Sequence, residues 1–581
     1  MEYKVGPLPI GPGSQILPLR RPGEIPHTKR PLDRHSGTWP YHSVSKPGTP
    51  ECSGDYISWL EYPFLHNDTS SRISVIKWHM IPGARGGDES FLHPLPLSFK
   101  LNETGLDPSQ WPAFDFEYCH QGPFESAAAL LQAFQSGQLR LCRLPGASDR
   151  DYDYLWSTTD ARVPKSPSAK PGPRQFMPRG PRFSLSSASG AGRRFRWFGW
   201  EGHVTLRADT GLSIFDVRYK NQRILYELSH QDMYVSYSGF GGAGQTFYMD
   251  SFFGIGYNCR PLRRGLDCPW HAAYVASELS YGTAGPGRQE AVLCLFEDDL
   301  AAPAWRHTHA GDRHPHADGA RGVDFVVRTV SSIGNYDYVF DVRFRQDASI
   351  EVKTTMAGYM STLYFDPGGA TAREAPFGTR VAEHVLANLH DHLSGWKVDL
   401  DVAGTANAFA TQRVRAGTYE QALRAAGARD ARAPAWASQQ VLKYIETTRP
   451  AVEAGLRVDG RTPTTWHFVN DRSLNAWGTP RGYAIVPGVT APQLLPEDHP
   501  LPQGESLNDT DLVAWVTIGV QHVPRSEDVP LIANFGANFY LKPWNYFDSL
   551  ESISADAEDS DDWETCSPNF AGQAFYQYSL G

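Results

Sequence analysis

Three histidines have the residue type and the spacing to bind a metal ion. His390 and His392 are separated by one residue, and His522 follows far downstream. On a β-strand, His390 and His392 would point to the same face and could share one ion, while Asp391 would point away. An imidazole from His522 would complete a three-nitrogen site that suits Cu(II) or Zn(II). A pair of this spacing also arises by chance in a chain with 20 histidines.

A tyrosine adds a second kind of chemistry to this candidate site. Tyr336 lies in an alternating apolar run, directly after Asn335 and before Asp337. Most tyrosines in such a strand are core or interface residues. Near three imidazoles, however, a tyrosine ring can be modified by the copper ion that the imidazoles hold. We therefore consider Tyr336 and the three histidines together.

The elements that would position these residues are mostly short strands with period-two alternation, separated by turn residues. Strands are predicted at 194–200, 204–208, 213–219, 325–331, 338–345, 350–355 and 513–519, and earlier at 72–79 and 96–101. Helices are predicted at 126–136 and at 419–426, the second opened by a Thr418/Gln421 capping box. This pattern is typical of a β-sandwich.

Length and composition divide the chain into parts. At 581 residues the chain exceeds the usual limit of a single core. Residues 1–55 are rich in Pro, Gly and Arg and are predicted to form an extended N-terminal arm. Residues 56–156 are predicted to form a small α/β domain, and the proline-rich segment 157–183 a linker. The fold class predicted is therefore mainly β, with a large antiparallel β-sandwich domain over 184–581.

Charge and hydropathy exclude some partners. The formal net charge is −10, and the Lys and Arg residues are scattered, so nucleic acid is not expected as a partner. No stretch has the roughly 18 apolar residues of a membrane helix, and the first thirty residues lack an apolar signal core. We expect no membrane span. Extracellular, peroxisomal and cytoplasmic locations stay open.

Three separated motifs resemble the copper amine oxidase family, in the order that the family has them. The first is Ser332-Ile-Gly-Asn335-Tyr336-Asp337; the second is His390-Asp-His392 followed by Trp396-Lys397-Val398-Asp399-Leu400-Asp401; the third is Asp511-Leu512 ahead of His522-Val-Pro-Arg-Ser-Glu-Asp528. The resemblance extends over most of the chain from about residue 96.

The resemblance implies a cofactor and a reaction. Copper held by the three histidines would use O2 to convert Tyr336, next to Asn335, into topaquinone. A primary amine would then be oxidised to an aldehyde, with release of ammonia and hydrogen peroxide. Family position assigns Asp250 as the base that takes a proton from the substrate carbon, and Tyr237 as a hydrogen-bond partner of the quinone. Phe247, Tyr248, Phe252 and Phe253 could form an apolar wall that raises the pKa of Asp250.

The resemblance also implies structural features. Cys268 and Cys294 match the family's disulfide, although two free buried thiols are the alternative. Side chains of Asp399, Asp401 and Asp511 with the carbonyls of Leu400 and Leu512 resemble a second metal site, whose oxygen ligands suit Ca2+. Solvated carboxylates are the alternative there. The family further implies a homodimer with interlocking sandwich domains.

Three other functions stay open. A copper-binding β-sandwich protein of the same fold would keep the histidines without quinone chemistry. A secreted carbohydrate-binding sandwich would need no copper. An amine oxidase fold could also serve an unusual biosynthetic amine, because the segment after Asp250, Ser-Phe-Phe-Gly-Ile-Gly, departs from the family pattern. The sequence does not identify the amine.

Overall fold

The computed structural model describes most of the chain after residue 90. The described residues are 2–6, 15–19, 41–43, 56–65, 72–80, 91–142 and 173–549, with interior gaps at 187–192, 240–245, 281–285, 310–315, 367–374, 428–440, 457–463 and 489–503 and at a few single positions. Most of the predicted arm over 1–55, and the predicted linker before residue 173, lie outside the described residues. The proposed boundaries between domains therefore stay predictions.

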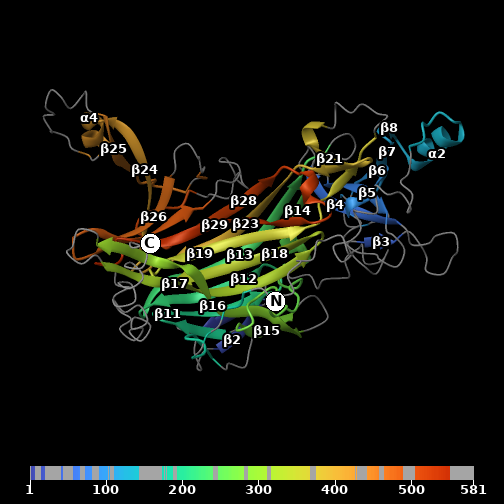
Figure 1. The fold of residues 1–581 in the computed structure, drawn as a ribbon. Helices are drawn as coiled ribbons and strands as arrows, with labels where there is room; N and C mark the ends of the chain where they lie inside the picture. The colour runs from blue at the N-terminus through green and yellow to red at the C-terminus, as the bar shows by residue number, and fades with distance from the viewer. Residues whose placement is uncertain are drawn as a thin grey trace, which may run out of the picture.

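Two large antiparallel sheets form the centre of the molecule (Figure 1). The eight-stranded sheet has the order β28 (Leu512–His522), β23 (His390–Leu400), β13 (Gln222–Tyr237), β12 (Gly211–Tyr219), β11 (Trp200–Arg207), β10 (Arg193–Trp197) and β9 (Ser184–Leu185), with β14 (Thr246–Met249) paired to β13. The ten-stranded sheet has the order β15 (Ala273–Ser280), β16 (Pro286–His309), β17 (His316–Ile333), β18 (Tyr336–Arg345), β19 (Ile350–Gly358), β29 (Ile532–Trp544), β27 (Pro480–Pro487), β26 (Thr464–Leu474), β24 (Ala408–Thr418) and β25 (Val441–Thr448).

The two sheets pack face to face over one apolar core. Along each strand every second side chain points inward, so the alternation in the sequence becomes a buried face. Phe195 packs against Phe325 of the other sheet with ring centroids 5.1 Å apart, and Trp200 packs against Phe344 at the same separation. All four side chains are fully buried. The predicted antiparallel β-sandwich is confirmed.

One predicted strand is wrong in detail. Residues 194–200 do not form a single strand, because a two-residue turn at Phe198 and Gly199 separates β10 from β11. Phe198 has a left-handed φ of 47°, which the alternation of apolar residues does not reveal. Both predicted helices occur, as α2 (Ala127–Gln135) and α4 (Tyr419–Ala425). The Thr418/Gln421 capping box is present, with both reciprocal hydrogen bonds.

Smaller sheets lie around the sandwich. A six-stranded sheet has the order β3 (Tyr41–Ser43), β4 (Tyr56–Leu65), β5 (Arg72–Met80), β6 (Pro94–Asn102), β7 (Ala113–Tyr118) and β8 (Gln121–Phe124); a three-stranded sheet contains β20 (Thr362–Tyr364), β22 (Val385–Asn388) and β21 (Gly378–Ala382); and β1 (Glu2–Gly6) pairs with β2 (Gln15–Leu19). The six-stranded sheet lies at one end of the sandwich, and the β24–β25 hairpin with α4 projects at the other (Figure 1). Short 3-10 turns are η5 (Asp250–Phe253), η8 (Ala375–Phe377) and η10 (Ser526–Asp528).

Two disulfides link described cysteines. Cys119 pairs with Cys142, which the sequence did not predict, and Cys268 pairs with Cys294. Among the described residues, no helix has the length and apolar character needed to cross a bilayer.

Candidate functional site

The three candidate histidines lie on two neighbouring strands of the eight-stranded sheet. His390 of β23 is the direct cross-strand partner of His522 of β28, and His392 lies two residues along β23. All three side chains therefore share the inner face of the sheet. The ring centroid of His390 is 5.0 Å from that of His392 and 4.8 Å from that of His522. The structure thus brings together the residues that the sequence singled out.

Hydrogen bonds fix which imidazole nitrogens are available to a metal. His390 Nδ1 lies 2.7 Å from the carbonyl of Asn388, and His522 Nε2 lies 3.0 Å from Asp528 Oδ2. Each of these nitrogens donates to its oxygen, so the neutral ring keeps a lone pair on its other nitrogen. Those two nitrogens, His390 Nε2 and His522 Nδ1, face each other at 3.2 Å. Two nitrogens that face each other at this distance can share one cation.

The third histidine supplies a further test of the fit to a metal. His392 Nε2 is buried and has no hydrogen-bond partner among the described residues. Burial lowers the pKa of His390 to about 3 and that of His392 well below its ordinary value. Both rings are therefore neutral at physiological pH, which is the form that binds metals. The donor set fits Cu(II).

Tyr336 approaches the histidines from the facing sheet. It is the first residue of β18, after a hairpin turn in which Gly334 has a left-handed φ of 58°. Its Oη lies 2.8 Å from His390 Nε2, and its ring centroid lies 4.4 Å from that of His392. The side chain is 2% exposed, and burial raises the pKa of the phenol well above its usual value. The phenol is therefore neutral, and its oxygen points at the nitrogens that would hold copper.

Asn335, the residue before Tyr336, contacts Tyr237, whose ring lies against His390. The Asn335 amide donates a hydrogen bond to Tyr237 Oη at 3.2 Å and a second to the carbonyl of Tyr359. Tyr237 is the cross-strand partner of His390, and its side chain is 2% exposed. The amide thus holds the Tyr237 hydroxyl in place beside the candidate centre.

Asp250 lies at the start of η5, immediately after β14. Its carboxyl is buried, and Oδ2 has no hydrogen-bond partner among the described residues. Burial raises the pKa of Asp250 well above its usual value, and the nearby Asp232 carboxylate raises it further. Of the predicted apolar wall, Tyr248 and Phe253 are half-buried against the core, whereas the side chains of Phe247 and Phe252 lie outside the described residues. A carboxyl with a raised pKa holds a proton more readily than an ordinary aspartate, which is the property a proton-transferring group needs.

Sequence reasoning missed Tyr338, which links Asp250 to the histidines. Tyr338 lies two residues after Tyr336 on β18, so both rings point inward, nearly parallel and 6.0 Å apart. Its hydroxyl hydrogen-bonds to Asp250 and lies 3.4 Å from His392 Nδ1. The period of two along β18 was the signal that could have identified Tyr338. Asp528, which hydrogen-bonds to His522, was also missed, although it lies in the third motif.

A cluster of acidic side chains lies at the other end of β23. Carboxylate oxygens of Asp399, Asp401 and Asp511 all lie within 4.8 Å of one another. Leu400 lies between Asp399 and Asp401, Leu512 follows Asp511, and the two leucines are direct cross-strand partners. Asp399 Oδ1 is buried without a hydrogen-bond partner among the described residues. Burial raises the pKa of Asp399 to about 6, against the opposing effect of Lys397, and Asp511 and Asp401 raise it further. These oxygens fit a hard divalent ion such as Ca2+.

The disulfide between Cys268 and Cys294 anchors the loop that follows η5. Its Cα atoms are 6.6 Å apart, and it joins this loop to β16. Both cysteines belong to a small apolar cluster with Phe296 and Val326 on the outer face of the ten-stranded sheet. Among the described cysteines, Cys259 is free and buried.

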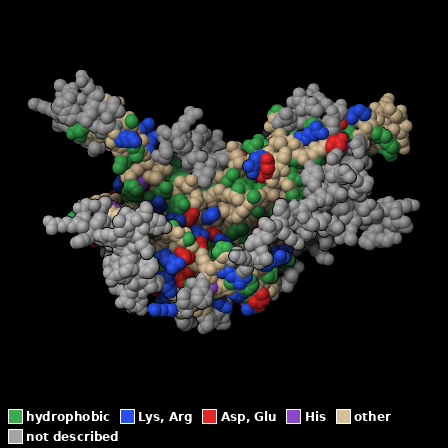
Figure 2. Space-filling view, viewed as in Figure 1, with side chains coloured by type: hydrophobic (Ala, Val, Ile, Leu, Met, Phe, Trp, Pro, Cys, Tyr) green, Lys and Arg blue, Asp and Glu red, His purple; other side chains and the backbone are tan. Residues whose placement is uncertain are grey.

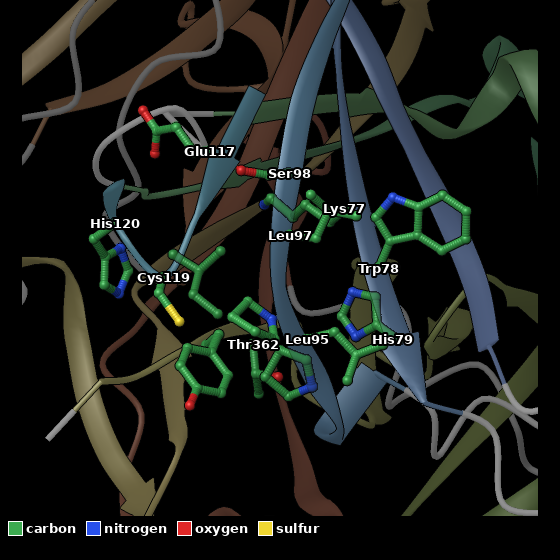
Figure 3. A pocket seen from close by; sticks show the side chains of 14 residues that line it. Lys77, Trp78, His79, Leu95, Leu97, Ser98, Glu117, Cys119, His120 and Thr362 are labelled. Carbon is green, nitrogen blue, oxygen red and sulfur yellow. The ribbon is translucent and has the colours of Figure 1, made fainter. Parts of the chain in front are cut away.

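Two other hollows do not suit an amine substrate. Figure 3 shows a pocket of about 40 Å³ between β5, β6 and β20, lined by Lys77, His79 and Thr362 among others, which has room for only a few water molecules. A larger hollow of about 670 Å³ is lined by four cationic side chains, Arg218, Lys220, Arg223 and Arg481, and two acidic ones, Asp401 and Asp548. This excess of positive charge would repel a protonated amine.

Comparison with known proteins identifies similar chains. The model of the copper amine oxidase enzyme domain matches residues 189–503 and 501–561. The chain is 31% identical over 519 residues to the Bos taurus primary amine oxidase, liver isozyme, a match that covers 80% of this chain and 64% of that protein. It is 31% identical over 623 residues to the Mus musculus copper-containing amine oxidase 3, covering 96% of this chain and 76% of that protein. The crystal structure of Pichia pastoris lysyl oxidase superimposes with a TM-score of 0.75 at 25% identity, covering 95% of this chain and 80% of that one.

Proposed function

This chain belongs to the copper amine oxidase family, and we propose that it oxidises a primary amine with Cu(II) and a topaquinone made from Tyr336. In the proposed reaction an amine, O2 and water give an aldehyde, ammonia and hydrogen peroxide. The substrate carbon loses two electrons, and O2 gains them. The 2.8 Å contact between Tyr336 Oη and His390 Nε2 is the observation that carries the proposal. It puts the phenol within reach of an ion held by the three histidines.

The chain's own residues would do the following work. His390 Nε2, His392 Nε2 and His522 Nδ1 would hold copper, with Asn388 and Asp528 fixing the rings. The quinone, once formed, supplies the electrophilic carbonyl and the electron sink that an amino-acid side chain lacks.

Proton transfer would be the work of the residues around Asp250. Asp250 would remove the proton from the substrate carbon, and Tyr338 would orient its carboxyl through their hydrogen bond. Asn335 and Tyr237 would fix the orientation of the modified ring. Burial of Asp250, Tyr338 and Tyr237 would exclude water from the proton transfer.

We further propose that Ca2+ binds at Asp399, Asp401 and Asp511. Lys397 already lies 2.6 Å from Glu227 and 3.6 Å from Asp399, and Arg223 pairs with Asp401. These cations offset part of the cluster's charge, so the ion would have a structural role. Calcium binding is measured by calorimetry on chelator-treated protein, and Asp399→Asn should abolish it.

A homodimer is proposed from the exposed apolar surface. Val414 and Ile445 are cross-strand partners on the projecting hairpin, and their side chains are 64% and 60% exposed. Val513 and Trp515 lie exposed on β28, an edge strand of the eight-stranded sheet. Figure 2 shows a hollow between the two projections, with hydrophobic side chains exposed inside it. Such surface usually marks an interface. Val414→Asp should shift the sedimentation coefficient toward the monomer.

The deciding experiment is copper reconstitution of metal-free protein in air. We expect a visible quinone absorbance, a phenylhydrazine adduct and peroxide release with primary amines. Tyr336→Phe should remove all three while copper still binds, and Asp250→Asn should keep the quinone but lose turnover. Tyr483→Phe is the matched control, because it removes a fully buried hydroxyl bonded to Ala348 elsewhere in the core.

The same experiment separates the alternatives. Copper binding without a quinone band would support the copper-binding protein of the same fold. A Tyr336→Phe variant that kept the quinone absorbance would show that the precursor is another residue.

A further inference from the structure

A second carboxylate, Asp232, contacts the turn that carries Asp250. Asp232 lies on β13 just after a bulge in its pairing with β23, at which the register shifts between His230 and Asp232. Its Oδ1 accepts a hydrogen bond from Ser251 N at 2.9 Å, and its Oδ2 accepts one from Ser251 Oγ at 2.7 Å. One carboxylate thus holds both the backbone and the side chain of the residue after Asp250.

These contacts satisfy donors that η5 cannot satisfy itself. The first N–H groups of a helical turn have no partner within the turn, and η5 has no side-chain cap from Met249. The N–H groups of Asp250 and Met233 also lie near enough to the Asp232 carboxylate to favour its ionised form. Asp232 therefore acts on η5 as a cap contributed by the neighbouring strand.

The two carboxylates lie in unequal surroundings. Asp232 accepts hydrogen bonds from Ser251 through both oxygens, whereas Asp250 Oδ2 has no partner among the described residues. The groups that act electrostatically on Asp250 are Asp232 from β13 and Tyr338 from β18. Burial raises the pKa of both acids, and that of Asp250 is raised more because Asp250 is more deeply buried, lies near the Asp232 carboxylate and gains fewer hydrogen bonds. In an unequal pair of this kind, the carboxyl whose pKa is raised more is the one suited to carry a proton.

We propose that Asp232 is a positioning residue for Asp250: through its two hydrogen bonds from Ser251 it anchors the first turn of η5, and it sets a second carboxylate beside the group that takes up and returns the proton. This inference rests on the proposed role of Asp250 as the base. The hydrogen bonds from Ser251 to Asp232 fix where the Asp250 oxygens lie. A negative charge on Asp232 raises the pH at which Asp250 loses its proton.

Three substitutions separate these two effects. Asp232→Asn removes the charge but keeps an oxygen for Ser251 N, and its amide can donate to Ser251 Oγ. Asp232→Ala removes the charge and the anchor. Ser251→Ala removes one hydrogen bond and leaves the charge. The control is Asp324→Asn, which alters a carboxylate that is 2% exposed but pairs with Arg343 in the network on the outer face of the sheet.

The variants are compared by kcat, kcat/KM against pH, copper content and phenylhydrazine titration. On the acidic side of the pH profile, kcat/KM falls as Asp250 becomes protonated, and this fall is called the acidic limb. Asp232→Asn should move the acidic limb to lower pH by about one unit, because the like charge that disfavours ionisation of Asp250 is gone. Asp232→Ala should lower kcat by about 100-fold through misplacement of the base, with quinone content unchanged. Ser251→Ala should lower kcat less and leave the limb in place. Asp324→Asn should cost stability without moving the limb.

The outcomes that overturn the inference are distinct from failure of the proposed function. If the unmodified protein forms quinone and oxidises amines but Asp232→Asn keeps the wild-type limb, the inference is wrong and the function stands. If Asp232→Ala does not fold, two other measurements test the inference: the acidic limb of Asp232→Asn and the kcat of Ser251→Ala. If the unmodified protein forms no quinone, the proposed function fails and this inference fails with it.

Discussion

Removing the carboxylate of Asp528 tests whether the protein prepares its histidines for copper. Asp528 is 2% exposed, and its Oδ2 accepts a hydrogen bond from His522 Nε2 at 3.0 Å. That bond keeps the proton on Nε2 and the lone pair on Nδ1, which faces His390 Nε2 at 3.2 Å. In Asp528→Ala the ring loses the acceptor that the described structure provides for Nε2, and it can rotate or change tautomer.

The expected loss follows from what such supporting groups contribute. Loss of a partner behind a metal ligand costs about 10- to 100-fold in affinity, which is about 1.4 to 2.7 kcal/mol. Asp528→Asn should lose less than Asp528→Ala, because its side-chain oxygen can still accept from Nε2. Copper affinity is measured by competition with a chelator on metal-free protein. Glu527→Ala is the control, because Glu527 is the exposed neighbour on the same turn.

A particular result would refute this reasoning. If folded Asp528→Ala binds copper within about threefold of the wild type, the hydrogen bond does not prepare His522, and the facing nitrogens owe their arrangement to strand register alone. Thermal unfolding of the metal-free variant shows whether it is folded.

Three other predictions concern the fold around the site. Gly358→Ala should destabilise the β18–β19 pair by more than about 1 kcal/mol and slow quinone formation, because an added Cβ would lie 2.1 Å from the carbonyl oxygen of Asn335. Unchanged urea unfolding together with an unchanged quinone yield would contradict this prediction. Cys268→Ser with Cys294→Ser should lower stability by about 3 kcal/mol by releasing a loop of 26 residues, read from urea unfolding, whereas Cys259→Ser should not have this effect. Metal-free protein should lose stability as pH falls below about 6.5, because burial lowers the pKa of His390 to about 3 and that of His230 to about 4, so that the unfolded chain binds protons that the folded one does not. His230→Leu should reduce the slope of unfolding free energy against pH by about 1.4 kcal/mol per pH unit, and an unchanged slope would count against a neutral His230.

Much of the fold followed from the alternation of apolar residues, and the rest depended on pairing over long distances. The shared face of His390 and His392 is a local property of one strand, so the sequence predicted it. The placement of His522 opposite His390 depends on the register between β23 and β28, which no local pattern specifies. That part of the site came from the resemblance to the family.

The residues that support the site were harder to predict for the same reason. Tyr338 could have been identified from its spacing to Tyr336, but Asp232 acts on Asp250 through a bulge and a turn that only the folded backbone reveals. Phe198 shows the opposite error: its apolar character suggested one continuous strand, yet its left-handed backbone divides two.

Because the phenol belongs to one sheet and the imidazoles to the other, the candidate centre spans the seam of the sandwich. A molecule whose layers had slid against each other by one residue pair would still contain every strand, yet its tyrosine would be out of reach of the ion. The quinone absorbance would then develop only in molecules whose two sheets have packed in the correct register. The quinone proposed to form from the Tyr336 side chain would then report correct assembly through its visible absorbance.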